Sequence, residues 1–195
     1  ENIAQEGADL RVACKSLVKF GSLETSQNPY VLGEKDPYFL GDYRNWTPEY
    51  DLLAKKHAKK SFVSAGDTFE EISGFLWLNR AKKCAVVTGA LWRRSWLNNA
   101  IIPDIYEEQG FGHAFVFTGQ KIIGGKPYLK AHLSNGTLIG DNGYFYFSKE
   151  IVEKECTFGN FGFIDLSLEE IERLKKENTP KKVSWLRRWW NSLIA

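Results

Sequence analysis

Residues 112–147 read GHAFVFTGQKIIGGKPYLKAHLSNGTLIGDNGYFYF, and this stretch decides the fold. Apolar, β-branched and aromatic residues gather in three parts of it, 113–118, 127–133 and 143–147, which we predict to be strands. Gly124-Gly125 lies between the first two, and paired glycines are typical of a tight hairpin turn. We therefore expect this stretch to be built around a β-hairpin.

The flanking sequence divides the chain into a helical first half and a strand-rich second half. Apolar residues at helical spacing predict helices over 11–20, 48–60 and 68–81, and residues 21–46 read as a long loop region. Further strands are predicted over 84–92 and 161–166. Helices followed by strands indicate an α+β fold with a cleft between two lobes.

Composition limits the classes of protein that fit. The chain has 195 residues and is 43% hydrophobic, enough to bury a core, and its 26 basic and 24 acidic residues give no reason to expect nucleic acid as a partner. No apolar run approaches the length of a membrane-spanning helix, and no secretory signal is visible. A cytoplasmic or assembly-associated location is therefore expected over secretion. Because the chain begins with Glu1 and has no Met, we expect further residues ahead of it.

Few residues suggest a cofactor or metal. The three cysteines, Cys14, Cys84 and Cys156, are too few for a disulfide framework, and no Cys/His/Asp spacing matches a zinc site. The GxSxG elbow of serine hydrolases and the phosphate-binding P-loop pattern are both missing. No metal and no cofactor are predicted.

Two short motifs carry a resemblance to a known family. Gly112-His113-Ala114, and Gly140-Asp141-Asn142 continuing as Gly143-Tyr144-Phe145, resemble the strand with the catalytic His and the GDNGYF-type motif of papain-like cysteine peptidases. The resemblance is specific over about 112–147 and weaker over 1–111. It implies a papain-like two-lobe domain over 1–166, with a helical lobe over about 1–82, a β lobe over about 83–166, and a helical tail over 167–195.

The resemblance also implies which positions carry the chemistry. Family members place a Cys thiolate at a helix start, where the helix dipole and a protonated His stabilise it, and a Gln six residues earlier helps to form the oxyanion hole. His113 corresponds to that His. Gln5 is the only Gln ahead of the first helix, and six residues later stands Arg11. Counting back from Gly143 places Leu133 where the family has the Asn that orients the His.

Arg11 and Leu133 together favour a papain-like pseudopeptidase, because a guanidinium is no nucleophile and a leucine accepts no hydrogen bond. A second alignment makes Cys14 the nucleophile and His113 its base, oriented by Asn135 or His132, and predicts a working peptidase for peptide or isopeptide bonds. A third hypothesis is a cleft that only binds a peptide or a glycan. The sequence leaves all three open.

The tail indicates a partner. Ser167 and Glu170 form a capping box for a helix to about Glu177, and a second short helix is expected over Ser184–Ile194. Its apolar face holds Trp185, Leu186, Trp189, Trp190, Leu193 and Ile194, and the other face holds Arg187, Arg188, Asn191 and Ser192. Such a face predicts docking on this chain's own core or on another protein subunit of a larger assembly; a membrane surface is the alternative. The chain also resembles the divergent papain-like domains of bacterial and phage proteins.

Overall fold

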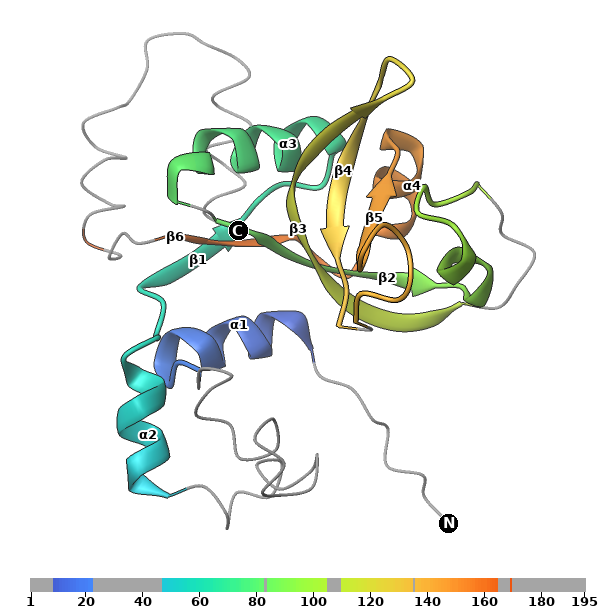
Figure 1. The fold of residues 1–195 in the computed structure, drawn as a ribbon. Helices are drawn as coiled ribbons and strands as arrows, with labels where there is room; N and C mark the ends of the chain where they lie inside the picture. Colours follow the sequence, from blue (N-terminus) through green and yellow to red (C-terminus); the bar gives the residue numbers. More distant parts are fainter. Residues whose placement is uncertain are drawn as a thin grey trace, which may run out of the picture.

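The computed structural model describes residues 9–22, 47–82, 84–104, 110–134, 136–164 and 169. An antiparallel six-stranded sheet in the order β1-β6-β2-β3-β4-β5 forms its centre (Figure 1). The strands are β1 (Ser61–Ser64), β2 (Val86–Trp92), β3 (Phe111–Ile123), β4 (Lys126–His132), β5 (Tyr144–Phe147) and β6 (Phe161–Ile164).

Helices cover both faces of the sheet. They are α1 (Leu10–Lys19), α2 (Pro48–Lys55), α3 (Phe69–Leu78) and α4 (Lys149–Glu155), with 3₁₀ turns over Arg80–Lys82 and Arg94–Asn98. A methyl group added to Gly162 would overlap Phe75 of α3, whereas one added to Gly89 would meet Leu10 of α1. Gly162 pairs with Val86, three residues from Gly89, and residues three apart in a strand point to opposite faces. α1 and α3 therefore pack on opposite faces, as Figure 1 shows.

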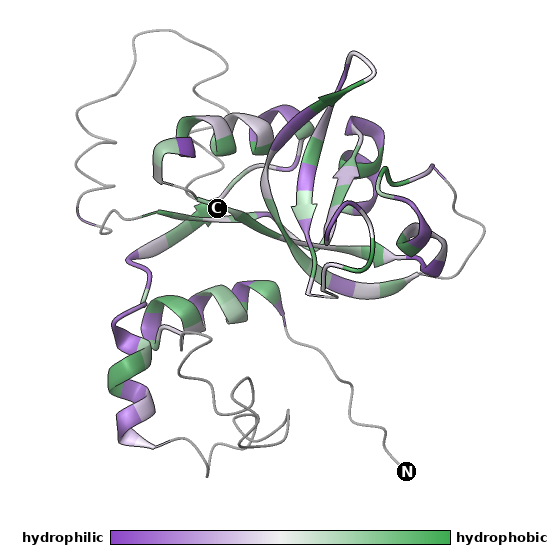
Figure 2. Cartoon of the chain, in the orientation of Figure 1, coloured by the Kyte–Doolittle hydropathy of each residue, from purple (hydrophilic) through white to green (hydrophobic). Residues whose placement is uncertain are grey.

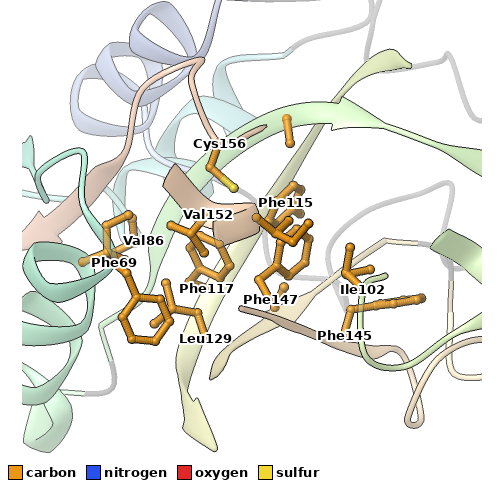
Figure 3. Close-up of a cluster of buried hydrophobic side chains, with 14 of the residues drawn as sticks. Phe69, Val86, Ile102, Phe115, Phe117, Leu129, Phe145, Phe147, Val152 and Cys156 are labelled. Carbon is orange, nitrogen blue, oxygen red and sulfur yellow. The ribbon is translucent and has the colours of Figure 1, made fainter. Parts of the chain in front are cut away.

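The main core lies on the α3 side and is rich in aromatic rings. Trp92 contacts Phe115, Phe145 and Phe147 at ring-centroid distances of 5.8, 5.4 and 6.1 Å, and Phe117 lies 5.5 Å from Phe147. Figure 3 shows Val152 of α4 close to Phe117 and Phe147, and Phe145 beside Ile102. Figure 2 shows hydrophobic residues along the central strands, whereas α1 and α2 carry both hydrophobic and hydrophilic residues. Rings at alternate positions of these strands thus form one layer, and the contacts between the rings hold β2, β3 and β5 together.

Local capping signals set the helix starts. Asp9 accepts a hydrogen bond from the Val12 N–H at 3.0 Å, and Thr47 accepts one from the Tyr50 N–H ahead of α2. Thr68 and Glu71 form a reciprocal capping box at the start of α3. Each cap satisfies backbone donors that lack a partner within the helix, so these short helices have defined first turns.

The GDNGYF motif forms a turn. Asn142 and Gly143 adopt positive φ values of 53° and 84°, and a methyl group on Gly143 would lie 2.8 Å from the Gly136 carbonyl oxygen. The Asp141 carboxylate accepts hydrogen bonds from the Tyr146 hydroxyl and, at 3.3 Å, from Lys121 Nζ. These contacts tie the turn to β3 and β5. The motif that carries the resemblance therefore has a structural role.

Several predicted elements differ from the observed ones. The expected helix over 48–60 ends at Lys55, because the chain turns and enters β1 at Ser61. β1 and α4 were not predicted. β1 pairs with β6 and α3 packs on the sheet, although the sequence assigns both to the helical lobe. The predicted tail over 167–195 lies outside the described residues, apart from Glu169.

Among the described helices, none combines the length and the apolar character that crossing a membrane requires.

A buried ion pair offers a test of the packing. Arg93 follows β2 and its guanidinium lies 3.0 Å from Glu155 at the end of α4, with side-chain exposures of 8% and 7%. Removing one partner leaves a buried charge, so Glu155→Ala should lower the free energy of unfolding by about 3–5 kcal/mol in urea denaturation. Glu70→Ala, which breaks the exposed Glu70–Lys149 pair, is the control and should have a far smaller effect. Equal effects would contradict this account of the pair.

Candidate functional site

His113 lies in β3 and points to the aromatic side of the sheet. It pairs with Ala90 of β2, and its ring is 5.6 Å from Trp92 and 6.4 Å from Phe111. The side chain is half-buried, and this burial lowers the pKa of the imidazole below its usual value. His113 is therefore a neutral imidazole at neutral pH, packed against rings.

The start of α1 packs on β2, on the face of the sheet opposite the one that His113 occupies. Leu10 reaches Gly89, whose partner across the β2–β3 ladder is Ala114, the residue after His113. The resemblance implies a helix start that meets the catalytic His, whereas here α1 and the His113 side chain lie on opposite faces of the sheet. In this structure, the first turn of that helix holds Arg11, which is exposed to solvent.

Cys14 lies in the second turn of α1. Its spacing from Leu10 places both on the same helix face, which packs on the sheet, and only 1% of Cys14 is exposed. Burial, assisted by the negative charge of Asp9, raises the pKa of the thiol to about 11. Reactive cysteines show the opposite, a lowered pKa with some exposure. Cys14 has the environment of a core residue.

The other two cysteines are no better placed. Cys156 is 4% exposed at the end of α4, and burial raises the pKa of its thiol to about 12. Cys84 is partly exposed but precedes Ala90, the ladder partner of His113, by six residues. At about 3.3 Å per residue this is about 20 Å along the strand direction. None of the three thiols has the exposure, pKa and position of a nucleophile for His113.

The structure places the other predicted residues as follows. Leu133, 3% exposed, belongs to the core, and its N–H donates to the Gly143 carbonyl at 3.3 Å. His132 is exposed, with its ring 4.8 Å from that of Tyr144. Gln5 and Asn135 lie outside the described residues, as do the tail residues Trp185, Arg187, Arg188, Trp189 and Trp190.

The surroundings of the site include residues that the sequence did not suggest. Phe158, which is 46% exposed, approaches Gly89, and one of its ring carbons would lie 3.5 Å from a methyl group on Gly112. Trp92 packs on His113 from the core side. The available signal in the sequence was the presence of Gly89 and Gly112 in neighbouring strands. Neither has a side chain, so a ring can lie above the sheet there.

Within the described residues, no group of three or more His, Cys, Asp or Glu side chains is placed to hold a metal ion.

Comparison with solved structures identifies the fold. The chain superposes on xylellain, a cysteine protease from Xylella fastidiosa, with a TM-score of 0.60 and 17% identity over 82% of this chain and 62% of that one. Digestive procathepsin L 3 of Tenebrio molitor larval midgut gives 0.56 and 15%, over 80% and 48%. Bromelain from Ananas comosus, in complex with the E64 inhibitor, gives 0.54 and 11%, over 76% and 66%.

The chain therefore has a papain-like α+β fold, far diverged in sequence from these proteases. It spans less than two thirds of the length of xylellain and about half that of procathepsin L 3. No protein-family model and no curated protein matches the sequence.

The lowered pKa of His113 has a consequence for stability. Its ordinary value is 6.5, so the unfolded chain binds a proton at a higher pH than the folded chain does. The contribution of neutral His113 to the free energy of unfolding is thus fully present above about pH 6.5. It is lost as the pH drops through the pKa of His113 in the folded state. His113→Phe, which keeps a ring against Trp92, should flatten the dependence of the melting temperature on pH between about 7 and 5. The exposed His132→Gln is the control and should keep the slope of the natural chain.

Proposed function

We propose that this chain is a papain-like pseudopeptidase, a domain that binds through its cleft and does not hydrolyse peptide bonds. The observation that carries the proposal is the state of Cys14: 1% exposed, inside α1, with the pKa of its thiol raised to about 11. Such a thiol supplies almost no thiolate at neutral pH, and the thiolate is the nucleophile.

The start of α1 supports the same conclusion. Asp9 uses its carboxylate to cap the helix, so a backbone N–H that would stabilise a thiolate there is already bonded to a fixed negative charge. Arg11 in that turn carries a guanidinium, which has no nucleophilic atom to attack a carbonyl group. The start of α1 therefore offers an acidic cap and a guanidinium where covalent catalysis would need an activated thiol.

His113 also differs from a catalytic histidine of this type. A thiolate–imidazolium pair needs an imidazole that holds its proton, whereas burial lowers the pKa of His113. Its neighbours Trp92 and Phe111 contact the imidazole through their aromatic rings in edge-to-face arrangements. We infer that His113 stands at the position of the family's catalytic histidine but contributes to packing and not to catalysis.

The α1 side of β2, which is the opposite face of the sheet from His113, favours a peptide as the ligand. Leu91 and Phe158 are 41% and 46% exposed, and Gly89 lies on the same face as Leu91. Exposed apolar side chains next to a glycine strand suit the side chains and backbone of an extended peptide. A structural or binding module of this kind also fits a role in a larger protein assembly.

Alkylation kinetics test the proposal. Treated with iodoacetamide at pH 7, the natural chain should label Cys14 and Cys156 slowly and Cys84, the most exposed thiol, first, as read by peptide mass spectrometry. Arg11→Cys should add a thiol that reacts much faster than Cys14. An ordinary pKa near 8.5 against about 11 corresponds to roughly 300 times more thiolate.

Rapid and selective labelling of Cys14 in the natural chain, lost in His113→Ala, would replace the pseudopeptidase with a working cysteine peptidase. Hydrolysis of a peptide library by the natural chain, also lost in His113→Ala, would lead to the same conclusion. The variant Cys14→Ser controls for labelling elsewhere, because it leaves Cys84 unchanged.

A further inference from the structure

A groove lies at the end of the molecule away from His113. Its walls are the last turn of α3 with Arg80 on one side and residues 118–120 of β3 on the other, and Cys84 and Ala85 lie between them. The volume is about 500 Å³, enough for one or two large side chains. Cys84 is about 20 Å from the strand position of His113, so the groove is separate from the cleft.

The rim of this groove is apolar and aromatic. Trp77 and Leu78 at the end of α3 are each 60% exposed, and the Arg80 guanidinium carbon lies 4.0 Å from the centre of the Trp77 ring. Arg80 is held in place because it also donates to the Trp77 carbonyl at 2.7 Å. An exposed tryptophan with a stacked guanidinium suits a second aromatic ring by stacking and cation–π contact.

The described strand β6 ends beside this groove. β6 runs antiparallel to β2, with Val86 opposite Gly162, and continuing that register brings Ile164 level with Cys84. Ile164 and Cys84 are both partly buried against the main core. Along α3, Phe75 packs on Gly162, so the last turn of this helix points toward the same end. The chain beyond β6 therefore leaves the sheet at the level of Cys84, which lines the groove.

The sequence beyond β6 supplies an apolar face of matching chemistry. The predicted helices over 168–177 and 184–194 are each about 15 Å long at 1.5 Å per residue. Pro180 lies in the short segment between them, and an antiparallel hairpin of two such helices would return its end to where it began. That return would bring the face with Trp185, Trp189 and Trp190 back to the groove. So short a helix needs a tertiary contact to be stable.

We propose that the C-terminal segment 184–194 of this same chain docks in the groove between α3 and β3, with a tryptophan of its apolar face stacked beside Trp77 and Arg80. The segment covers the exposed Trp77 and Leu78 and fastens the end of the chain to the sheet. The contact is independent of whether the cleft hydrolyses peptides.

Disulfide trapping tests the contact, because Cys84 already lines the groove. Trp185→Cys and Trp189→Cys, each in the full chain under mild oxidation, should form an intramolecular disulfide with Cys84. Docking raises the local concentration of the thiol, so the bond should form about tenfold or more faster than in Arg188→Cys, on the opposite face of the segment. Peptide mapping identifies the bond, and Cys84→Ser must abolish it.

Disulfides between two chains would overturn the proposal in favour of a second copy as the occupant. Equal trapping rates in Trp189→Cys and Arg188→Cys would overturn it as well. Sedimentation of the natural chain with anionic phospholipid vesicles, lost in Trp189→Ala and without trapping at Cys84, would assign the apolar face to a membrane.

Limited proteolysis gives a second measurement that needs no new cysteine. Lys181 and Lys182 immediately precede the segment. Trp77→Ala should speed tryptic cleavage there about tenfold, the effect of truncating one anchoring aromatic side chain at an interface. Ile122→Ala removes an equally exposed apolar side chain (66%) near the tip of the β3–β4 hairpin and should leave the rate unchanged. The same cleavage rate in both variants would contradict docking.

Discussion

The contact of Trp92 with the rings around it is the interaction on which the rest of the structure depends. Three strands meet at this side chain, because β2 supplies it, β3 supplies Phe115, and β5 supplies Phe145 and Phe147. β4 lies between β3 and β5 and holds the spacing. His113 is in the same row of side chains as Phe115, two residues away, so the packing of this layer also fixes the imidazole.

This dependence explains how the packing can maintain a papain-like fold independently of catalysis. Ring packing requires only that side chains of the right size alternate along β2 and β3, and a histidine satisfies that requirement as a flat, half-buried ring. The turn at Asp141 to Tyr144 is likewise maintained by backbone geometry and by the bonds of Asp141 to Lys121 and Tyr146. Both motifs contribute to stability irrespective of a nucleophile. Their presence in the sequence is therefore evidence about the fold and not about activity.

The sequence predicted the β-hairpin, the strands β2 to β6 and the starts of three helices, because glycine pairs, alternation and capping residues are local signals. It missed β1, whose four residues SFVS show little alternation, since that strand is specified by its pairing with β6 a hundred residues later. It also missed α4, although Ser148 is an N-cap and Ile151 and Val152 form a short apolar face. Seven residues are too few for helical periodicity to be read with certainty.

Site residues are harder to predict because counting along a sequence assumes loops of fixed length. The position of Leu133 followed from counting back through the loop before Gly143, and that loop can lengthen or shorten without disturbing either strand. The pairing register of the strands gives a more reliable correspondence between positions. Val116 faces His132 across β3 and β4, so each step toward His113 on β3 corresponds to one step beyond His132 on β4. By that rule Leu133 corresponds to Phe115, a core position, which agrees with its 3% exposure. The helix start needs no such correction, because Asp9 caps α1 and thereby leaves Cys14 one turn inside it, where burial keeps the thiol protonated.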